Sequence, residues 1–333
     1  MRYNPRLPQT HQLSPFAAFG IWATLTLAGA LYFSWHGYGG VAFAAALTAF
    51  AFFFLFQLLF AARGVSEKLS ARFGRAGGFA VGLSVFLVYL IYSLGTNTFA
   101  PSRVGVIAGL ILIPLLLATS AQNSAPGAWQ DFLTFIGVWI AVKFVPAGWL
   151  WPFPGGSFAH VLVILFNLTV ALAAFALIRR VGGVGYSIGW GCNWAFFIIA
   201  SVALCACIII PLGTGIHFIQ FAPRWSEWRT IPLVSMGTLL FTAWPEEFLF
   251  RGLLQNLLSR ASSSDLAGWS TASILFGLSH LPNSHFPNWR YAVLASIAGL
   301  FYGWTWRKTG SIFASALVHM LVNVMWHFLF KTV

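Results

Sequence analysis

Long apolar runs separated by short polar segments dominate the chain. A run of about 20 apolar residues can cross a bilayer as a helix, because the hydrocarbon core is about 30 Å thick. Runs of this kind lie at 16–35, 40–62, 78–95, 104–121, 129–148, 158–178, 188–213, 231–258, 266–281, 289–306 and 311–330. The pattern therefore predicts an all-α polytopic membrane protein, a bundle of about 10–11 transmembrane helices.

The composition points the same way. The chain has 333 residues, of which 59% are hydrophobic and 7% charged, with a mean hydropathy of +0.81. These values lie outside the range of soluble domains, so the lipid bilayer is the predicted environment. Lysine and arginine outnumber aspartate and glutamate by 18 to 6, but they are spread through the connecting segments rather than gathered in one patch. Nucleic acid is therefore not a predicted partner.

The basic residues instead predict how the chain is oriented. Cytoplasmic loops of membrane proteins carry an excess of lysine and arginine. On this basis we predict an integral multi-pass protein with a cytoplasmic N-terminus and, for an odd number of spans, a non-cytoplasmic C-terminus. The predicted regions are a tail at 1–15, an N-terminal transmembrane region of about seven spans at 16–215, an aromatic interfacial connection at 216–230, and a C-terminal transmembrane region at 231–330.

Two adjacent glutamates, Glu246 and Glu247, lie inside the apolar run 231–258. Charges within membrane helices are costly and therefore indicate function by default. Residues four apart share a helix face, so Glu247 is predicted to pair with Arg251. Glu246 is rotated about 100° from Glu247, which leaves it free to handle protons. Pro245 predicts a kink or a helix start just before the pair.

Two later spans also carry polar groups at comparable depth. His280 follows Phe276 by one turn, and Asn323 follows His319 by one turn. At about 1.5 Å per residue, Glu246, His280 and His319 lie roughly 18, 21 and 12 Å from the predicted cytoplasmic helix ends. A carboxylate and an imidazole can deprotonate a water, while a second imidazole and an amide can donate to an oxyanion. This set of groups predicts peptide hydrolysis.

Three short motifs on these spans carry a resemblance to a known family. They are EEFLFR (Glu246, Glu247, Arg251), FGLSH (Phe276, His280) and HMLVN (His319, Asn323). They are similar, in this order, to the EExxxR, FxxxH and HxxxN motifs of the CAAX-processing and bacteriocin-processing (CPBP, or Abi) family of intramembrane proteases. The similarity covers about residues 230–327 and implies that 231–330 is a CPBP-like catalytic core.

The resemblance also implies a role for each matching residue. Glu246 and His280 would activate a water molecule, and His319 with Asn323 would form the oxyanion site, in a glutamic-type mechanism that needs no metal or other cofactor. Supporting roles are implied for Glu247, Arg251 and Phe276. The implied substrate is a membrane-anchored protein or peptide, cleaved near its C-terminal tail.

Structural or metal-binding roles for the same residues also remain open. Glu247 with Arg251 can be a buried ion pair that only fixes helix packing, and His319 with Asn323 can hold helices together by hydrogen bonds. A zinc site formed by Glu246, His280 and His319 would leave an open position for water. The sequence has no HExxH motif, which disfavours zinc.

Two other classes of function also remain open. A secondary transporter could use the intramembrane glutamate and histidine groups as a proton relay, although no internal repeat supports that interpretation. A non-catalytic membrane scaffold is the third hypothesis, and it would have no need for three intact motifs.

Overall fold

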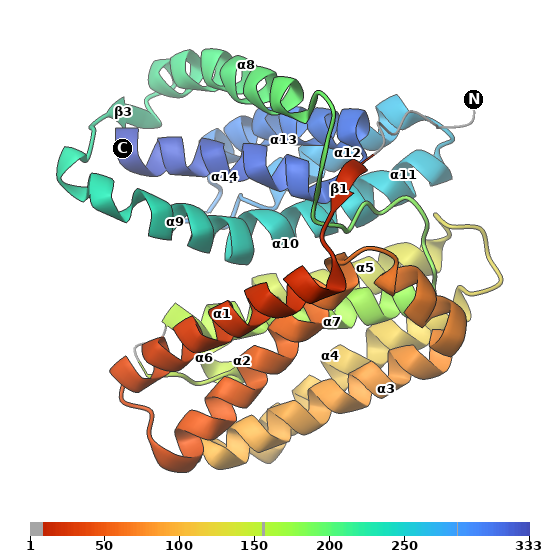
Figure 1. The fold of residues 1–333 in the computed structure, drawn as a ribbon. Helices are drawn as coiled ribbons and strands as arrows, with labels where there is room; N and C mark the ends of the chain where they lie inside the picture. The colour runs from red at the N-terminus through yellow and green to blue at the C-terminus, as the bar shows by residue number, and fades with distance from the viewer. Residues whose placement is uncertain (1–8, 155–156, 285) are drawn as a thin grey trace. The chain divides into compact units, whose positions relative to one another are not determined.

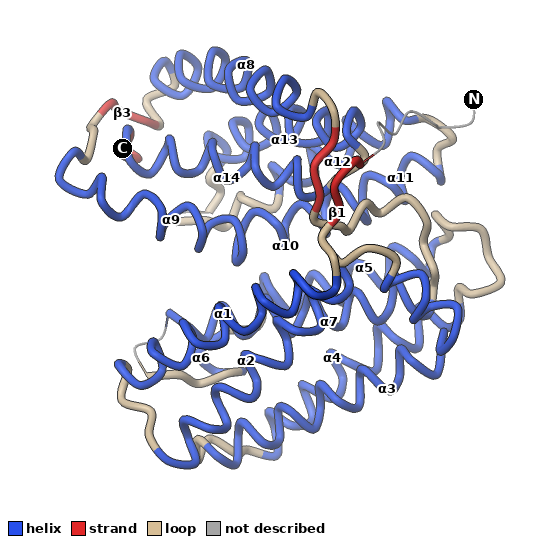
Figure 2. Tube along the Cα trace, viewed as in Figure 1, coloured by secondary structure: helices blue, strands red, loops and turns tan. Residues whose placement is uncertain are grey.

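The computed structural model describes residues 9–154, 157–284 and 286–333, and its chain forms two compact helical units. The N-terminal unit comprises residues 13–182. The C-terminal unit comprises residues 183–333 and also takes in residues 9–12 (Figure 1). Strands are confined to two short two-stranded sheets in the described part of the chain (Figure 2), so the predicted all-α class is confirmed.

The N-terminal unit is built from long apolar helices around an aromatic core. Its elements are α1 (Pro15–Trp35), α2 (Gly40–Ala61), α3 (Val65–Gly95), α4 (Pro101–Ser120), α5 (Trp129–Phe144), α6 (Ala147–Leu150), α7 (Ser157–Leu172) and the π-helix η1 (Ala173–Ile178). Phe33, Phe53 and Trp151 are completely buried there. Such large aromatic side chains fill the space between helices at low cost in side-chain entropy.

A buried ion pair fastens the end of this unit. Asp131 at the start of α5 accepts hydrogen bonds from Arg179, with Nε 2.6 Å from Oδ1 and Nη2 3.1 Å from Oδ2. The backbone N–H of Gly127 also donates to Asp131, and Arg179 donates to the carbonyl of Ser124. Both charges are therefore compensated, which is what their burial requires.

The C-terminal unit carries all the residues of the three motifs. Its elements are β1 (Gln9–Gln12), β2 (Gly189–Gly191), α8 (Trp194–Gly215), β3 (Ile219–Phe221), the 3-10 helix η2 (Trp225–Thr230), α9 (Ile231–Thr238), η3 (Leu239–Ala243), α10 (Trp244–Glu247), η4 (Phe248–Gln255), α11 (Asn256–Ala261), α12 (Asp265–Leu278), α13 (Trp289–Thr309), α14 (Ile312–Leu329) and β4 (Phe330–Thr332). β1 pairs with β2, and β3 pairs with β4, both antiparallel.

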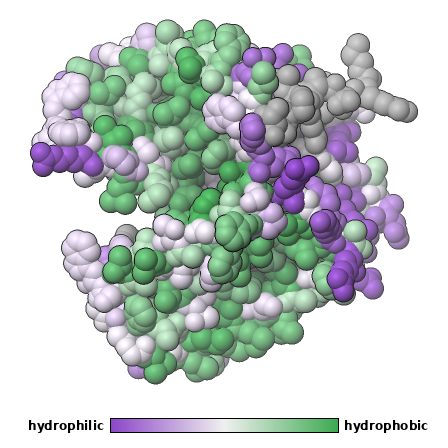
Figure 3. Space-filling view, in the orientation of Figure 1, coloured by the Kyte–Doolittle hydropathy of each residue, from purple (hydrophilic) through white to green (hydrophobic). Residues whose placement is uncertain are grey.

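Within the described residues, seven helices are long and apolar enough to span a membrane by length and composition: α1 to α4, the α7–η1 helix, α8 and α14. Apolar side chains also cover much of the visible surface (Figure 3), as expected of an integral multi-pass membrane protein. The other four predicted spans are helical as well. α5 and α12 are shorter, with 16 and 14 residues, whereas α13 has 21 residues but carries three basic ones.

The predicted span 231–258 forms a helical path without a break from Ile231 to Ala261. Pro245 does not interrupt it, because π-helical turns lie on both sides, at η3 and η4. A π-helix shifts the hydrogen-bond register by one residue and often marks a functional site. The predicted helix start at Pro245 is therefore wrong: helical structure runs through this residue, and the helix type changes on either side of it instead.

A small sheet ties the connection 216–230 to the end of α14. The ladder β3–β4 is extended by two backbone bonds, from Ala222 to Leu329 (2.9 Å) and from Val333 to Phe218 (3.0 Å). This connection leads directly into α9 and the glutamates, and exposed Trp225 and Trp228 lie within it. The sheet therefore joins the helix of His319 to the helical path of Glu246.

We expect Lys331→Pro to destabilise the C-terminal unit by about 2 kcal/mol. In an antiparallel ladder, every second pair of opposite residues is joined by backbone hydrogen bonds. The pairs 222/329 and 218/333 are bonded in this way, so Gln220 and Lys331, which lie midway between them, form a bonded pair as well. Proline removes that N–H donor. Thermal unfolding of the purified protein measures the effect, and Lys331→Ala is the control, because it changes the side chain and keeps the donor. Equal melting temperatures for both variants would contradict this role of the sheet.

Candidate active site

Four helices of the C-terminal unit bring the three motifs together. α10 carries the two glutamates and packs against α14, which carries His319 and Asn323. α12 carries Phe276 at its buried face and packs against both η4 and α13. His280 lies two residues beyond the end of α12.

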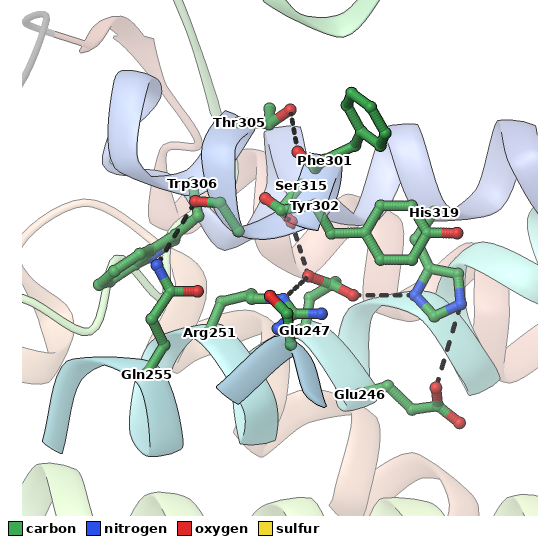
Figure 4. Close-up of polar contacts among 12 residues, drawn as sticks. Glu246, Glu247, Arg251, Gln255, Phe301, Tyr302, Thr305, Trp306, Ser315 and His319 are labelled. Atoms are coloured by element: carbon green, nitrogen blue, oxygen red, sulfur yellow. Dashed lines mark hydrogen bonds and ion pairs between the residues drawn. The ribbon is translucent and has the colours of Figure 1, made fainter. Parts of the chain in front are cut away.

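The carboxylate of Glu247 contacts three other side chains of the site (Figure 4). Its side chain is completely buried, and the predicted ion pair with Arg251 is present, with Arg251 Nε 3.1 Å from Oε2. Ser315 Oγ donates to the same oxygen at 2.6 Å, and His319 Nδ1 lies 2.9 Å from Oε1. Glu247 is therefore committed to holding α10, η4 and α14 together.

Glu246 has a different environment, although it is the next residue. Its side chain is 30% exposed, whereas that of Glu247 is 0% exposed. Glu246 Oε2 lies 4.0 Å from His319 Nε2, which is too long for a direct hydrogen bond (Figure 4). Of the two glutamates, only Glu246 has a side chain that is open to a water or a substrate.

The contact between His319 and Glu247 determines which ring nitrogen faces the open side of the site. A carboxylate accepts hydrogen bonds, so Nδ1 of His319 carries the hydrogen. Nε2 is then the nitrogen that faces Glu246. The ring of Tyr302 stacks on the imidazole of His319, with ring centroids 4.5 Å apart and an interplanar angle of 15°. This contact fixes the plane of the imidazole.

His280 is fixed in a similar way. Its Nδ1 lies 2.8 Å from the carbonyl oxygen of Phe276 and 3.2 Å from Ser279 Oγ. Because a carbonyl only accepts, Nδ1 is the protonated nitrogen of the neutral ring, and Nε2 keeps its lone pair. The imidazole also lies against two aromatic rings, those of Phe276 and Tyr291, each with a centroid 4.8 Å away.

Phe276 links the three motifs. Its ring centroid lies 4.8 Å from that of His280 and 5.7 Å from that of His319, and the Arg251 guanidinium carbon lies 5.0 Å from it. A cation over an aromatic face is stabilised by the quadrupole of the ring. The phenylalanine of the second motif therefore positions groups of the other two motifs.

Asn323 is not drawn into this network. It lies one turn beyond His319 on α14 and is partly exposed. Its side chain makes no hydrogen bond to any residue that the structure describes. Its amide is thus available to a ligand, and the predicted oxyanion role stays a prediction.

Sequence reasoning missed three residues of the site: Ser315, Tyr302 and Tyr291. Ser315 precedes His319 by one turn on the same face, and that spacing was the available signal. Tyr302 and Tyr291 gave no signal, because 17% of the chain is aromatic. Tyr291 belongs to the site because its ring lies against the imidazole of His280, with the ring centroids 4.8 Å apart.

The ligand set of a zinc site does not form among the described residues. Within 9–154, 157–284 and 286–333, no three histidine, cysteine, aspartate or glutamate side chains converge as metal ligands. Among the described residues, Glu246, His280 and His319 therefore give no support to a zinc site.

Comparison with protein families gives a match on the same segment. Residues 228–325 match the family described as Rce1-like, type II CAAX prenyl endopeptidase. This match bears out the predicted resemblance of this segment to the CPBP family of proteases. Comparisons with curated proteins and with solved structures found no match.

Proposed function

We propose that the segment 228–325, which matches the Rce1-like CAAX endopeptidase family, cleaves a peptide bond with a water molecule activated by Glu246 and His280. One observation carries the proposal. Of two adjacent glutamates, Glu247 is buried and bound by three side chains, while Glu246 is partly exposed and faces Nε2 of His319. A general base must reach its water, and only Glu246 meets that condition.

The reaction can be followed atom by atom. Glu246 takes a proton from water, and the lone pair of His280 Nε2 orients that water. The water oxygen forms a bond to the peptide carbonyl carbon, whose oxygen becomes an oxyanion. When the C–N bond breaks, the proton held by Glu246 passes to the leaving nitrogen. The base thus acts next as the acid, and the carboxylate is restored.

The oxyanion is assigned to His319 and Asn323. The Asn323 amide has two donor hydrogens, and its side chain is not used elsewhere in the described structure. His319 Nε2 becomes a donor when the ring carries protons on both nitrogens, since Nδ1 already donates to Glu247. Removing one oxyanion donor typically slows hydrolysis by about 100-fold or more.

The substrate is proposed to be a membrane-anchored protein or peptide precursor, cut near its C-terminal tail. The family match supports this class, because the family is described by its action on CAAX sequences. A cytoplasmic N-terminus is proposed together with it, from the distribution of lysine and arginine.

Tyr291 is expected to position His280 in this reaction, and Tyr291→Leu should lower kcat about 10- to 100-fold with little change in KM. Its ring lies against the imidazole, and a small displacement of a catalytic group is costly. Steady-state hydrolysis in liposomes measures the effect. Tyr291→Phe is the matched control, which keeps the ring and should stay within about threefold of native. Equal losses in both variants would assign the effect to the hydroxyl and contradict the role of the ring.

The experiment that tests the function compares protein termini in cells. Membrane proteins from cells carrying the native chain or Glu246→Gln, accumulated to equal levels, are analysed by terminal-peptide mass spectrometry. We expect a set of new C-termini that occurs only with the native chain and that identifies both the substrate and the cut bond. Identical termini would overturn the proposal, and proton transport in proteoliposomes would then be the next measurement.

A further inference from the structure

Helix α3 is too long for the membrane that it would cross. It runs over 31 residues, from Val65 to Gly95, which is roughly 46 Å at 1.5 Å per residue. The hydrocarbon core is about 30 Å thick. Gly74 divides the helix with φ 45° and ψ −125°, a backbone conformation open to glycine but not to other residues. Residues 75–95 are long enough to span the core, and residues 65–73 extend beyond it.

The break at Gly74 is held by a specific contact. A helix broken at this position leaves the carbonyl of Ser70 without its N–H partner. Arg180 Nη2 donates to that carbonyl at 2.7 Å. A Cβ on Gly74 would lie 2.5 Å from the same nitrogen, so glycine also provides the room that the guanidinium needs. The angle between the two parts of α3 is therefore built into the fold.

The short part of α3 is amphipathic. Val65, Leu69 and Phe73 follow one another at four-residue spacing and share one face. Lys68 and Arg72 share a second face, also four residues apart. Val65 and Leu69 are half-buried, and Phe73 is 49% exposed. An apolar stripe beside a basic stripe is the pattern of a helix that lies in the membrane interface.

The basic side chains here are open to a ligand. We call residues 63–75 the basic segment. Its four cations, Arg63, Lys68, Arg72 and Arg75, are all exposed, and Glu67 is its one acid, so its net charge is +3 (4 − 1). None of the four forms an ion pair within the described part of the chain. Figure 3 shows hydrophilic side chains gathered at this end of the N-terminal unit.

We propose that the basic segment binds the phosphate headgroups of anionic phospholipids. Clusters of four or more lysine and arginine residues next to a transmembrane helix attract anionic lipid. Their long side chains can reach the headgroups while the apolar stem stays beside the acyl chains. Arg72 also lies over the ring of Phe73 at 5.3 Å, which couples the charged stripe to the apolar one.

The chemistry favours a lipid over free phosphate. Free phosphate would use only the cations, whereas a lipid also covers the exposed ring of Phe73. The basic stripe comes first in α3, on the side predicted to be cytoplasmic, where anionic lipids carry the negative surface potential. The inference concerns the N-terminal unit and does not rest on the proposed protease function.

The test measures binding of single lipids to the detergent-solubilised full chain by native mass spectrometry. Phosphatidylglycerol is the anionic probe and phosphatidylcholine is the zwitterionic one. We expect Arg72→Gln/Arg75→Gln to weaken phosphatidylglycerol binding about 30-fold, the equivalent of two interfacial cations, and to leave phosphatidylcholine unchanged. The matched control is Arg224→Gln/Arg229→Gln, which removes two exposed arginines from the C-terminal unit and should change binding less than threefold.

Two further variants distinguish a lipid site from a phosphate site. If the double variant does not accumulate, Lys68→Gln alone should still weaken binding about fivefold. Phe73→Ser should weaken phosphatidylglycerol binding as well, which a site for free phosphate would not show. Equal loss in both double variants, or full displacement of the lipid by millimolar inorganic phosphate, would overturn the assignment.

Discussion

Glu246→Gln is expected to slow peptide hydrolysis by at least about 100-fold, with KM within about threefold of native. Glutamine keeps the size and the hydrogen-bonding reach of the side chain but cannot take a proton from water, and general-base catalysis typically contributes about 100- to 10,000-fold. The substitution leaves the buried contacts of Glu247 untouched. Hydrolysis rates of purified variants in liposomes, with the substrate identified from cellular termini, measure the effect.

Glu227→Gln is the matched control. Glu227 lies in the same unit, its side chain is 46% exposed, and its contacts with Arg224 and His327 are both 3.9 Å long. The Glu227→Gln variant therefore loses an accessible carboxylate that lies away from the site. Its rate of peptide hydrolysis should stay within about twofold of native. A Glu246→Gln enzyme with native kcat would remove Glu246 as the base.

Interactions along one helix could be predicted from the sequence, and those between helices could not. Glu247 and Arg251 pair as expected, because i,i+4 spacing alone brings them together. The contacts of Glu247 with Ser315 and His319 join residues about 70 positions apart, and they depend on how α10 packs against α14. No spacing rule gives that packing.

The same limit explains the transmembrane count. Apolar length alone identified all seven helices that meet the length and hydropathy conditions. It also identified 129–148 and 266–281, where the structure has helices of only 16 and 14 residues. Hydrophobic runs continue through turns, so apolarity overestimates the length of these two helices. The predicted division into an N-terminal region 16–215 and a catalytic region 231–330 stays a prediction. The compact units divide the chain differently, because they group α8 with the C-terminal helices.

Arg251→Met is expected to lower the free energy of unfolding by about 3–5 kcal/mol. The Arg251 side chain is completely buried, and its removal leaves the buried Glu247 carboxylate without its cation. At about 3 °C per kcal/mol, the melting temperature in detergent should fall by about 10 °C. Arg260→Met is the control on the same helical path, since Arg260 is exposed and its contact to Asn256 is not an ion pair.

The double variant Glu247→Gln/Arg251→Met decides what the ion pair is for. Removing both charges removes the uncompensated one, so at least half of the lost stability should return. Activity should not return with it, because a neutral glutamine cannot stabilise the doubly protonated His319 as the Glu247 carboxylate does at 2.9 Å. A stable but inactive double variant would show that the buried charge serves the orientation of His319 rather than helix packing. Recovery of both properties would reduce the pair to a packing device and leave Glu246 as the one functional carboxylate of the motif.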